Sequence, residues 1–66
     1  MAEQTLANRE VIIEFFPVGQ YMKVSAMDTA TLTEISIHGP VSTPEHTLRQ
    51  NALKRLEYVL KKKGLI

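Results

Sequence analysis

Residues 10–16 read EVIIEFF, and this stretch governs the interpretation of the whole chain. Successive side chains of a strand point to opposite faces of a sheet, so the segment has one face suited to a hydrophobic core. That face consists of Val11, Ile13 and Phe15. The opposite face carries Ile12 and Phe16, and a soluble chain of 66 residues must either cover these two large side chains or expose them.

Two further segments alternate in the same way. Residues 21–28, YMKVSAMD, follow a turn at 17–20, and residues 32–38, LTEISIH, follow a turn that begins at Asp28. Pro and Gly set the backbone angles of the first turn, and the Asp28 side chain can bond its own backbone in the second. The pattern predicts a three-stranded antiparallel meander.

The length of the first turn predicts how the strands pair. A four-residue loop at 17–20 would pair Phe16 with Tyr21. It would also place Glu14 opposite Lys23, which gives a favourable pair of opposite charges. Apolar side chains of one face then meet one another: Phe15 with Met22, Ile13 with Val24, Val11 with Ala26, Ala26 with Ile35 and Val24 with Ile37. A shift by one residue would move every side chain to the opposite face.

A C-terminal helix is expected over residues 45–63. Apolar residues recur there at helical spacing and form one stripe: Leu48, Ala52, Leu53, Leu56, Val59 and Leu60. The sequence allows two ways for the helix to begin. Either Thr43 is the N-cap and Pro44 the first helical residue, or Ser42 and Glu45 form a capping box. Gly64 suits the position just after the helix.

The fold class is therefore α+β, a three-stranded antiparallel meander followed by one C-terminal helix (βββα). Residues 9–64 form a single domain, and residues 1–8 show no pattern and predict a flexible N-terminal tail. A chain of this size buries only about 60% of its unfolded surface, which leaves a monomer near the limit of stability. The chain has no Cys for disulfides, and oligomerisation is a common remedy in such small domains.

One helix covers one face of the sheet and leaves the other face open. The apolar residues of the open face are Ile12, Phe16, Tyr21 and Met27. We expect them to form the contact surface of a homodimer, because two-fold dimers are the commonest assembly. Two arrangements stay open. The EVIIEFF strands can pair edge to edge, or the protomers can exchange their helices in a domain swap, because the connector at 39–44 is short and extended.

Charge is distributed unevenly along the chain. Residues 1–41 hold two basic and five acidic residues, whereas residues 42–66 hold six basic and two acidic residues. The six are possible nucleic-acid contacts: Arg49, Lys54, Arg55, Lys61, Lys62 and Lys63. Binding through them would depend steeply on salt. Because no aromatic stacking platform accompanies them, nucleic-acid binding ranks as the alternative to a role in protein interaction.

No residue pattern indicates catalysis, a cofactor or a metal site. Glu34, Ser36 and His38 share a strand face, but residues two apart on a strand are about 6.6 Å apart along the chain, too far for a nucleophile and its base. We therefore expect a non-enzymatic protein. The chain shows no signal peptide and no apolar run that could span a bilayer, which predicts a cytoplasmic location.

Four segments together resemble a short bacterial family of uncharacterised proteins, alphaproteobacterial in type, with a domain of unknown function. These segments are REVIIEFFPVG (9–19), KVSAMD (23–28), TEISIHGP (33–40) and ALKRLEYVLKKKG (52–64). The resemblance covers about residues 9–64. It implies a free-standing cytoplasmic protein, and it assigns no activity and no catalytic residue.

Overall fold

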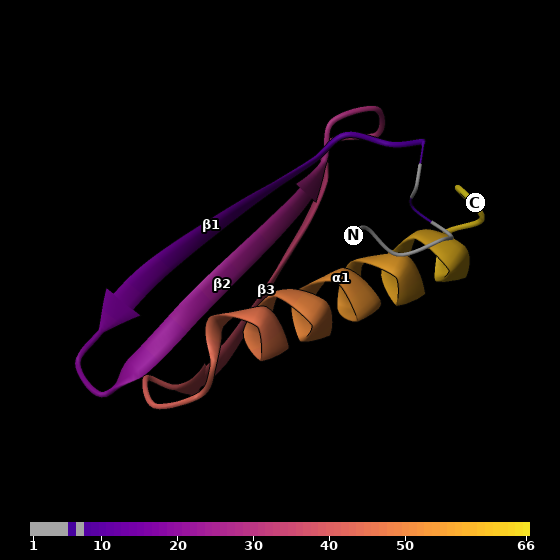
Figure 1. Ribbon diagram of the computed structural model, residues 1–66. Coiled ribbons are helices and arrows are strands. Elements are labelled where there is room, and N and C mark those ends of the chain that lie inside the picture. The colour runs from indigo at the N-terminus through magenta and orange to yellow at the C-terminus, as the bar shows by residue number, and fades with distance from the viewer. Residues whose placement is uncertain (1–5, 7) are drawn as a thin grey trace.

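The computed structural model describes Leu6 and residues 8–66, which form three strands and one helix. The elements are β1 (Val11–Val18), β2 (Tyr21–Asp28), β3 (Thr33–Pro40) and α1 (Glu45–Lys62). The strands form one antiparallel sheet in the order β1-β2-β3, and α1 lies along one face of it (Figure 1). The βββα meander expected from the sequence is confirmed.

The hydrophobic core lies between α1 and the sheet, with α1 packed over β2 and β3. Its buried members are Leu6, Val24, Ala26, Leu48, Ala52, Leu53, Leu56 and Leu60. Partly buried side chains surround them: Val11, Ile13, Phe15, Met22, Ile35 and Ile37. Every sheet residue that the alternation assigned to the inner face therefore packs there.

The first hairpin is tighter than the sequence analysis predicted. Only Gly19 and Gln20 separate β1 from β2. Gly19 has a φ of +60°, and Gln20 is absent from the positive-φ residues. This combination is typical of a type II′ turn, which matches the natural twist of two antiparallel strands. The four-residue loop predicted at 17–20 is therefore wrong, because Pro17 and Val18 belong to β1.

The register of β1 against β2 is consequently shifted by two residues from the predicted one. The observed pairs include Val11–Asp28, Ile13–Ala26, Glu14–Ser25, Phe15–Val24 and Val18–Tyr21. Lys23 pairs with Phe16, so the predicted opposition of Lys23 to Glu14 is wrong, and so is that of Phe16 to Tyr21. A shift by an even number keeps every side chain on its own face, which is why the core assignment survives.

The second hairpin has the predicted register. Ala26 pairs with Ile35 and Val24 with Ile37. The turn contains Leu32 at a φ of +60°, in the left-handed region that side chains other than glycine occupy at an energetic cost.

The helix begins differently from either predicted start. Pro44 occupies the N-cap position with a ψ of 142°, and no side chain bonds the first turn. Because this ψ is extended, Pro44 lies outside the helix, so it cannot be the first helical residue after a Thr43 cap. The capping box of Ser42 and Glu45 is also not formed. The Pro44 carbonyl accepts the first backbone bond of the helix from the Leu48 amide, at 3.2 Å.

The C-terminal end of α1 closes as predicted. Gly64 has a φ of +73°, and its amide donates to the Lys61 carbonyl at 3.0 Å. The Leu65 amide donates to the Leu60 carbonyl at 2.8 Å. These two hydrogen bonds define a Schellman motif, in which a left-handed glycine satisfies the last carbonyls of the helix.

The connector at 41–44 brings the chain back so that α1 covers the sheet of its own chain (Figure 1). The short connector therefore permits packing within one chain. Of the predicted tail at 1–8, the structure describes Leu6 and Asn8, and Leu6 is 1% exposed within the core. The rest of that prediction lies outside the described residues.

Candidate interaction surface

The sheet face opposite α1 carries large apolar side chains in exposed positions. Ile12 and Phe16 are each 42% exposed, and Tyr21 is 58% exposed. Met27 is partly buried beside Ile12, with which it pairs. The four residues predicted as an association surface thus share one face of the sheet.

These residues fall into two areas on that face. Ile12 and Met27 form one area near the start of β1. Val18, its pair Tyr21, and Phe16 form the other area near the end of β1. The row between the two areas is polar: Glu14, Ser25 and Ser36. The exposed apolar side chains therefore lie on β1 and at the two adjoining ends of β2, with a polar row between the two areas.

Val18 belongs to this surface and was missed in the sequence analysis. It was assigned to the turn, whereas the structure makes it the last residue of β1 and exposes its side chain. The missed signal is the Gly19–Gln20 pair. Gly followed by any residue is typical of a two-residue hairpin turn, and such a turn would have extended the strand to Val18.

Strand β1 is an outer strand, so one side of its backbone pairs with β2 and the other side forms a free edge. The Thr29 amide donates to the Glu10 carbonyl at 3.1 Å. Because backbone direction alternates along an antiparallel ladder, even-numbered residues of β1 bond toward β2 and odd-numbered residues face the free edge. The edge-facing residues with an amide are Val11, Ile13 and Phe15. Pro17 follows in this row and has no amide.

Strand β3 forms the other outer strand and has a different character. The Val41 amide donates to the Gln20 carbonyl at 2.9 Å, so the same alternation turns the backbone groups of three polar residues outward. These residues are Glu34, Ser36 and His38, and all three side chains are exposed. Charged and polar residues on an outer strand oppose pairing with other chains. The apolar edge is therefore β1.

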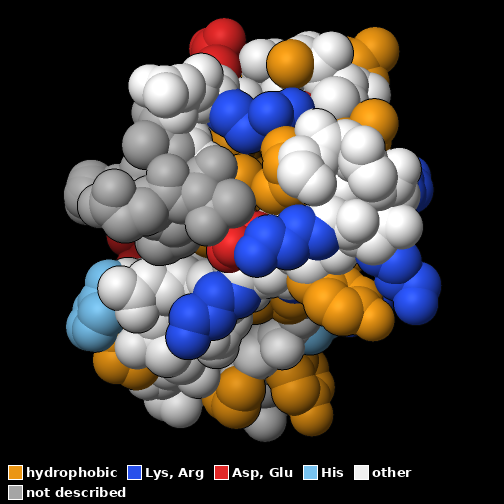
Figure 2. All heavy atoms as spheres, turned by 90° about the vertical axis from the view of Figure 1, so that its right-hand side faces the viewer, with side chains coloured by type: hydrophobic (Ala, Val, Ile, Leu, Met, Phe, Trp, Pro, Cys, Tyr) orange, Lys and Arg blue, Asp and Glu red, His pale blue; other side chains and the backbone are white. Residues whose placement is uncertain are grey.

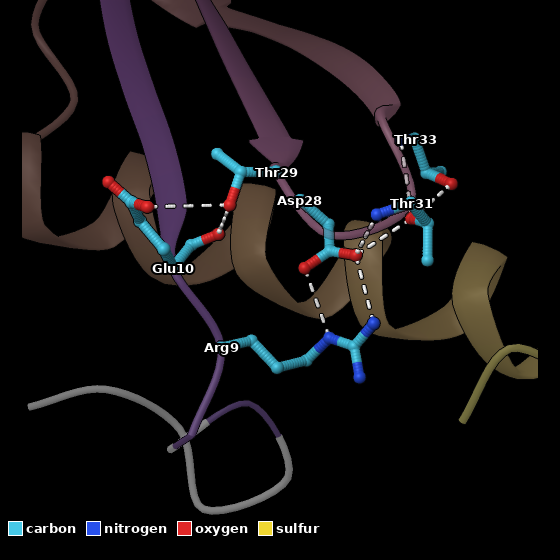
Figure 3. Close-up of polar contacts among 6 residues, drawn as sticks. All are labelled: Arg9, Glu10, Asp28, Thr29, Thr31 and Thr33. Carbon is cyan, nitrogen blue, oxygen red and sulfur yellow. Dashed lines mark hydrogen bonds and ion pairs between the residues drawn. The ribbon is translucent and has the colours of Figure 1, made fainter.

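A partly buried ionic cluster ties the start of β1 to the end of β2 (Figure 3). Arg9 donates from Nε and Nη2 to the two carboxylate oxygens of Asp28, at 3.0 and 2.9 Å. The amide and hydroxyl of Thr31 also donate to Asp28, at 3.1 and 2.7 Å. The Thr31 hydroxyl lies 2.8 Å from that of Thr33.

This cluster holds Asp28 in its charged form. The hydrogen bonds from Arg9, and then those from Thr31, outweigh burial and lower the pKa of Asp28 to about 2. The same bond raises the pKa of Arg9. Because the Asp28 side chain is fully buried and multiply bonded, its role is to fix the hairpin and the entry to β1.

Two basic side chains lie over the aromatic rings of β1. On the outer face, the Lys23 ammonium is 5.8 Å from the centre of the Phe16 ring. On the inner face, the Arg49 guanidinium is 5.6 Å from the centre of the Phe15 ring. Cations are attracted to the faces of such rings, so positive charge stands beside β1 on both sides of the sheet.

Four of the six basic residues at 42–66 lie beside acidic or aromatic groups of their own chain. Figure 2 shows Lys and Arg side chains at several separate places on the side of the molecule that includes the C-terminal end of α1, with hydrophobic side chains between them. Lys61 is 3.1 Å from Glu57. Arg55 and Lys62 both lie over the Tyr58 ring, at 5.5 and 5.8 Å. With Arg49 over Phe15, four of the six candidate nucleic-acid contacts are engaged by groups of their own chain.

Within Leu6 and residues 8–66, no three acidic or histidine side chains come together as ligands for a metal ion. In the same part of the chain, no helix combines the length and apolar character needed to cross a membrane. Glu34, Ser36 and His38 occupy separate rows of the outer face, opposite Met27, Ser25 and Lys23 respectively.

The fold and this surface define a small α+β protein, a βββα meander with an apolar outer strand. A family model described as a domain of unknown function (DUF6898) matches residues 8–63, so the chain belongs to this family. The match confirms the resemblance to an uncharacterised family. No curated protein and no solved structure matches the chain.

Proposed function

We propose that the protein is a small cytoplasmic interaction module without enzymatic activity, and that it works as a homodimer. The observation that carries the proposal is β1, an outer strand of eight residues with exposed apolar side chains on one face and partly buried ones on the other. An apolar outer strand is a template for pairing with another chain. A second copy is the simplest partner, because a two-fold dimer joins one surface to itself.

Pairing through β1 would bury apolar surface that a single chain leaves accessible. The structure has an accessible surface of 4449 Å², near the value of about 4,200 Å² that size scaling gives for this mass. The fold therefore buries no more than an ordinary chain of its size. Pairing through β1 would remove further apolar surface from water, and each Å² so buried would stabilise the dimer by about 25 cal/mol.

Sedimentation velocity over a broad concentration range tests the proposal. We expect a particle of twice the 7.5 kDa chain mass at high concentration. The double variant Ile12→Ser/Phe16→Ser should weaken association by about tenfold or more, which corresponds to about 1.4 kcal/mol. Tyr58→Ser is the matched control, because Tyr58 is an exposed aromatic residue on α1, and it should leave association unchanged. A folded particle of single-chain mass at every concentration would overturn the proposal.

A further inference from the structure

We propose that two copies pair through β1 in one antiparallel register, with Ile13 of one copy opposite Ile13 of the second copy. This inference rests on the proposed homodimer and specifies its strand arrangement. The result would be one continuous six-stranded sheet. Its centre would consist of two β1 strands, and an α1 helix would lie on the same face at each end.

The free edge of β1 is open to a second copy. Figure 1 shows β1 on the side of the sheet away from α1, which packs over β2 and β3. No helix or strand of the described residues lies along that edge. A second β1 can therefore approach in the plane of the sheet without displacing the core.

Backbone donors and acceptors favour a two-fold axis at Ile13. In an antiparallel two-fold pair, residues at equal distances from the axis lie opposite each other. An axis at Ile13 places Val11 opposite Phe15 of the second copy, and Phe15 opposite Val11 of the second copy. Every edge-facing amide and carbonyl of these three residues then has a partner, because all of them fall in hydrogen-bonded pairs.

An axis moved to Ile12 gives a poorer match. Phe15 would then lie opposite Arg9 of the second copy. The Arg9 amide already donates to the Leu6 carbonyl at 3.1 Å, so it cannot donate to a second strand without losing that bond. The Arg9 side chain also holds Asp28, which restrains the backbone at this point.

An axis moved to Glu14 is also poorer, for two reasons. Val11 would lie opposite Pro17 of the second copy, and Pro17 has no amide to donate. The two Glu14 carboxylates would lie directly opposite each other, and like charges in that position are destabilising. Of these three neighbouring registers, only the one centred at Ile13 pairs every edge-facing amide and carbonyl of Val11, Ile13 and Phe15, because it places Arg9 and Pro17 opposite each other, and it keeps the two Glu14 carboxylates from lying directly opposite.

The inner-face side chains at the centre of the Ile13 register also match. There Val11, Ile13 and Phe15 of the two copies oppose one another and extend the partly buried rim of the core, while Pro17 lies opposite Arg9. On the outer face, Phe16 lies opposite Glu10 of the second copy. The Lys23 ammonium already lies 5.8 Å from the centre of the Phe16 ring, so the register brings an acidic side chain toward a basic one.

Cysteine cross-linking tests the register, and the chain has no Cys of its own to interfere. The single variants Ile12→Cys and Glu14→Cys both place the thiol on the exposed outer face. With the axis at Ile13, these two positions lie opposite each other in different copies, about 4.5 Å apart at Cα in a non-hydrogen-bonded pair. The Cα atom of each position is about 7–8 Å from that of the same position in the second copy, a diagonal distance beyond the usual disulfide range.

We therefore expect disulfide-linked dimers when the two single variants are mixed and mildly oxidised, and few when either variant is oxidised alone. Efficient cross-linking of Ile12→Cys alone, or of Glu14→Cys alone, would overturn the proposed register. If sedimentation shows a dimer that gives no cross-link in the mixture, the register is wrong while the proposed function stands. A monomer in sedimentation would overturn both.

Amide hydrogen exchange of the unmodified chain gives a second measurement that requires no variant. The amides of Val11, Ile13 and Phe15 should exchange slowly at high concentration and rapidly on dilution. The outward-facing amides of β3 are the control and should exchange rapidly throughout: Glu34, Ser36 and His38. If the protein is a dimer and the β1 amides still exchange rapidly, the edge pairing is wrong. A domain swap of α1 between protomers would give that result.

Discussion

Leu48 occupies the space that a side chain on Gly39 would need. A Cβ placed on Gly39 would lie 2.7 Å from Cδ2 of Leu48, closer than real Cβ atoms approach other atoms. Both residues are buried where the end of β3 meets the first turns of α1. Glycine in a strand often marks such a close approach, and here it sets how closely the helix sits on the sheet.

Gly39→Ala should therefore destabilise the fold by about 1–3 kcal/mol, the usual cost of overpacking a core. Urea unfolding followed by circular dichroism measures the change. On a Leu48→Ala background, the added methyl group has room, so its cost should fall by about 0.5 kcal/mol or more, the size of coupling expected between residues in contact. An equal cost on both backgrounds would show that the Leu48 contact is not the cause.

Leu32→Asn should stabilise the protein by about 0.5–1 kcal/mol. Leu32 has a φ of +60° and is 73% exposed, so it has a strained backbone and gives little burial in return. Asn tolerates the left-handed region better than Leu does. Ala30→Asn is the control in the same turn, because Ala30 is exposed and has no positive φ. Thermal unfolding of both variants checks the prediction, and equal shifts in the two would contradict it.

The Arg9–Asp28 pair should make stability depend on acid. The pKa of Asp28 is about 2 in the folded chain and ordinarily 3.8. Since the folded pKa is the lower one, ionised Asp28 stabilises the folded chain. Its contribution to the free energy of unfolding is complete above pH 3.8 and is lost as the pH falls toward 2. Asp28→Asn should cost about 1–3 kcal/mol at neutral pH. The urea midpoints of the unmodified chain and of Asp28→Asn should come closer together in acid. A difference between them that does not change with pH would contradict the stabilising role of ionised Asp28.

Nucleic-acid binding by α1 should be weak. Four of the six candidate cations at 42–66 lie beside Glu57, Tyr58 or Phe15. A salt titration by fluorescence anisotropy with mixed-sequence DNA and RNA measures this. Micromolar affinity with a steep salt slope is the outcome that would instead favour the nucleic-acid alternative. The substitution Lys54→Ala/Lys63→Ala would then test two further candidate contacts.

The faces of the sheet could be predicted from the alternation of apolar residues, whereas the first register could not be predicted from that alternation and depended on the Gly19–Gln20 turn signal. Alternation has a period of two, so it assigns Phe15 and Phe16 to opposite faces wherever the turn falls. A four-residue and a two-residue turn leave the same side chains inward. The positive φ of Gly19 separates the two registers, and it belongs to the backbone, so the pattern of apolar residues could not reveal it.

The Arg9–Asp28 pair was missed for a different reason. Asp28 was correctly expected to bond its own turn, because that interaction is local. Its second partner is 19 positions away. The predicted register, with Val11 opposite Ala26, would also have brought Arg9 opposite Asp28, so the ion pair was missed because the alternation of apolar residues does not identify charged partners distant in the sequence. Leu6 was missed because the residues around it have no periodic pattern to indicate burial. The four outer-face residues could be placed by parity, and their use in association stays a prediction.

Pro17 and Pro40 lie at the same end of the sheet, because Val18 pairs with Tyr21 and Tyr21 pairs with Pro40. Each terminates the row of donors on one outer strand. A foreign peptide that paired with either outer strand would find no backbone donor at that end, which opposes the strand-by-strand addition that builds amyloid fibrils. We expect concentrated solutions of this protein to remain clear on storage, without the thioflavin signal that exposed apolar strands of other small proteins acquire.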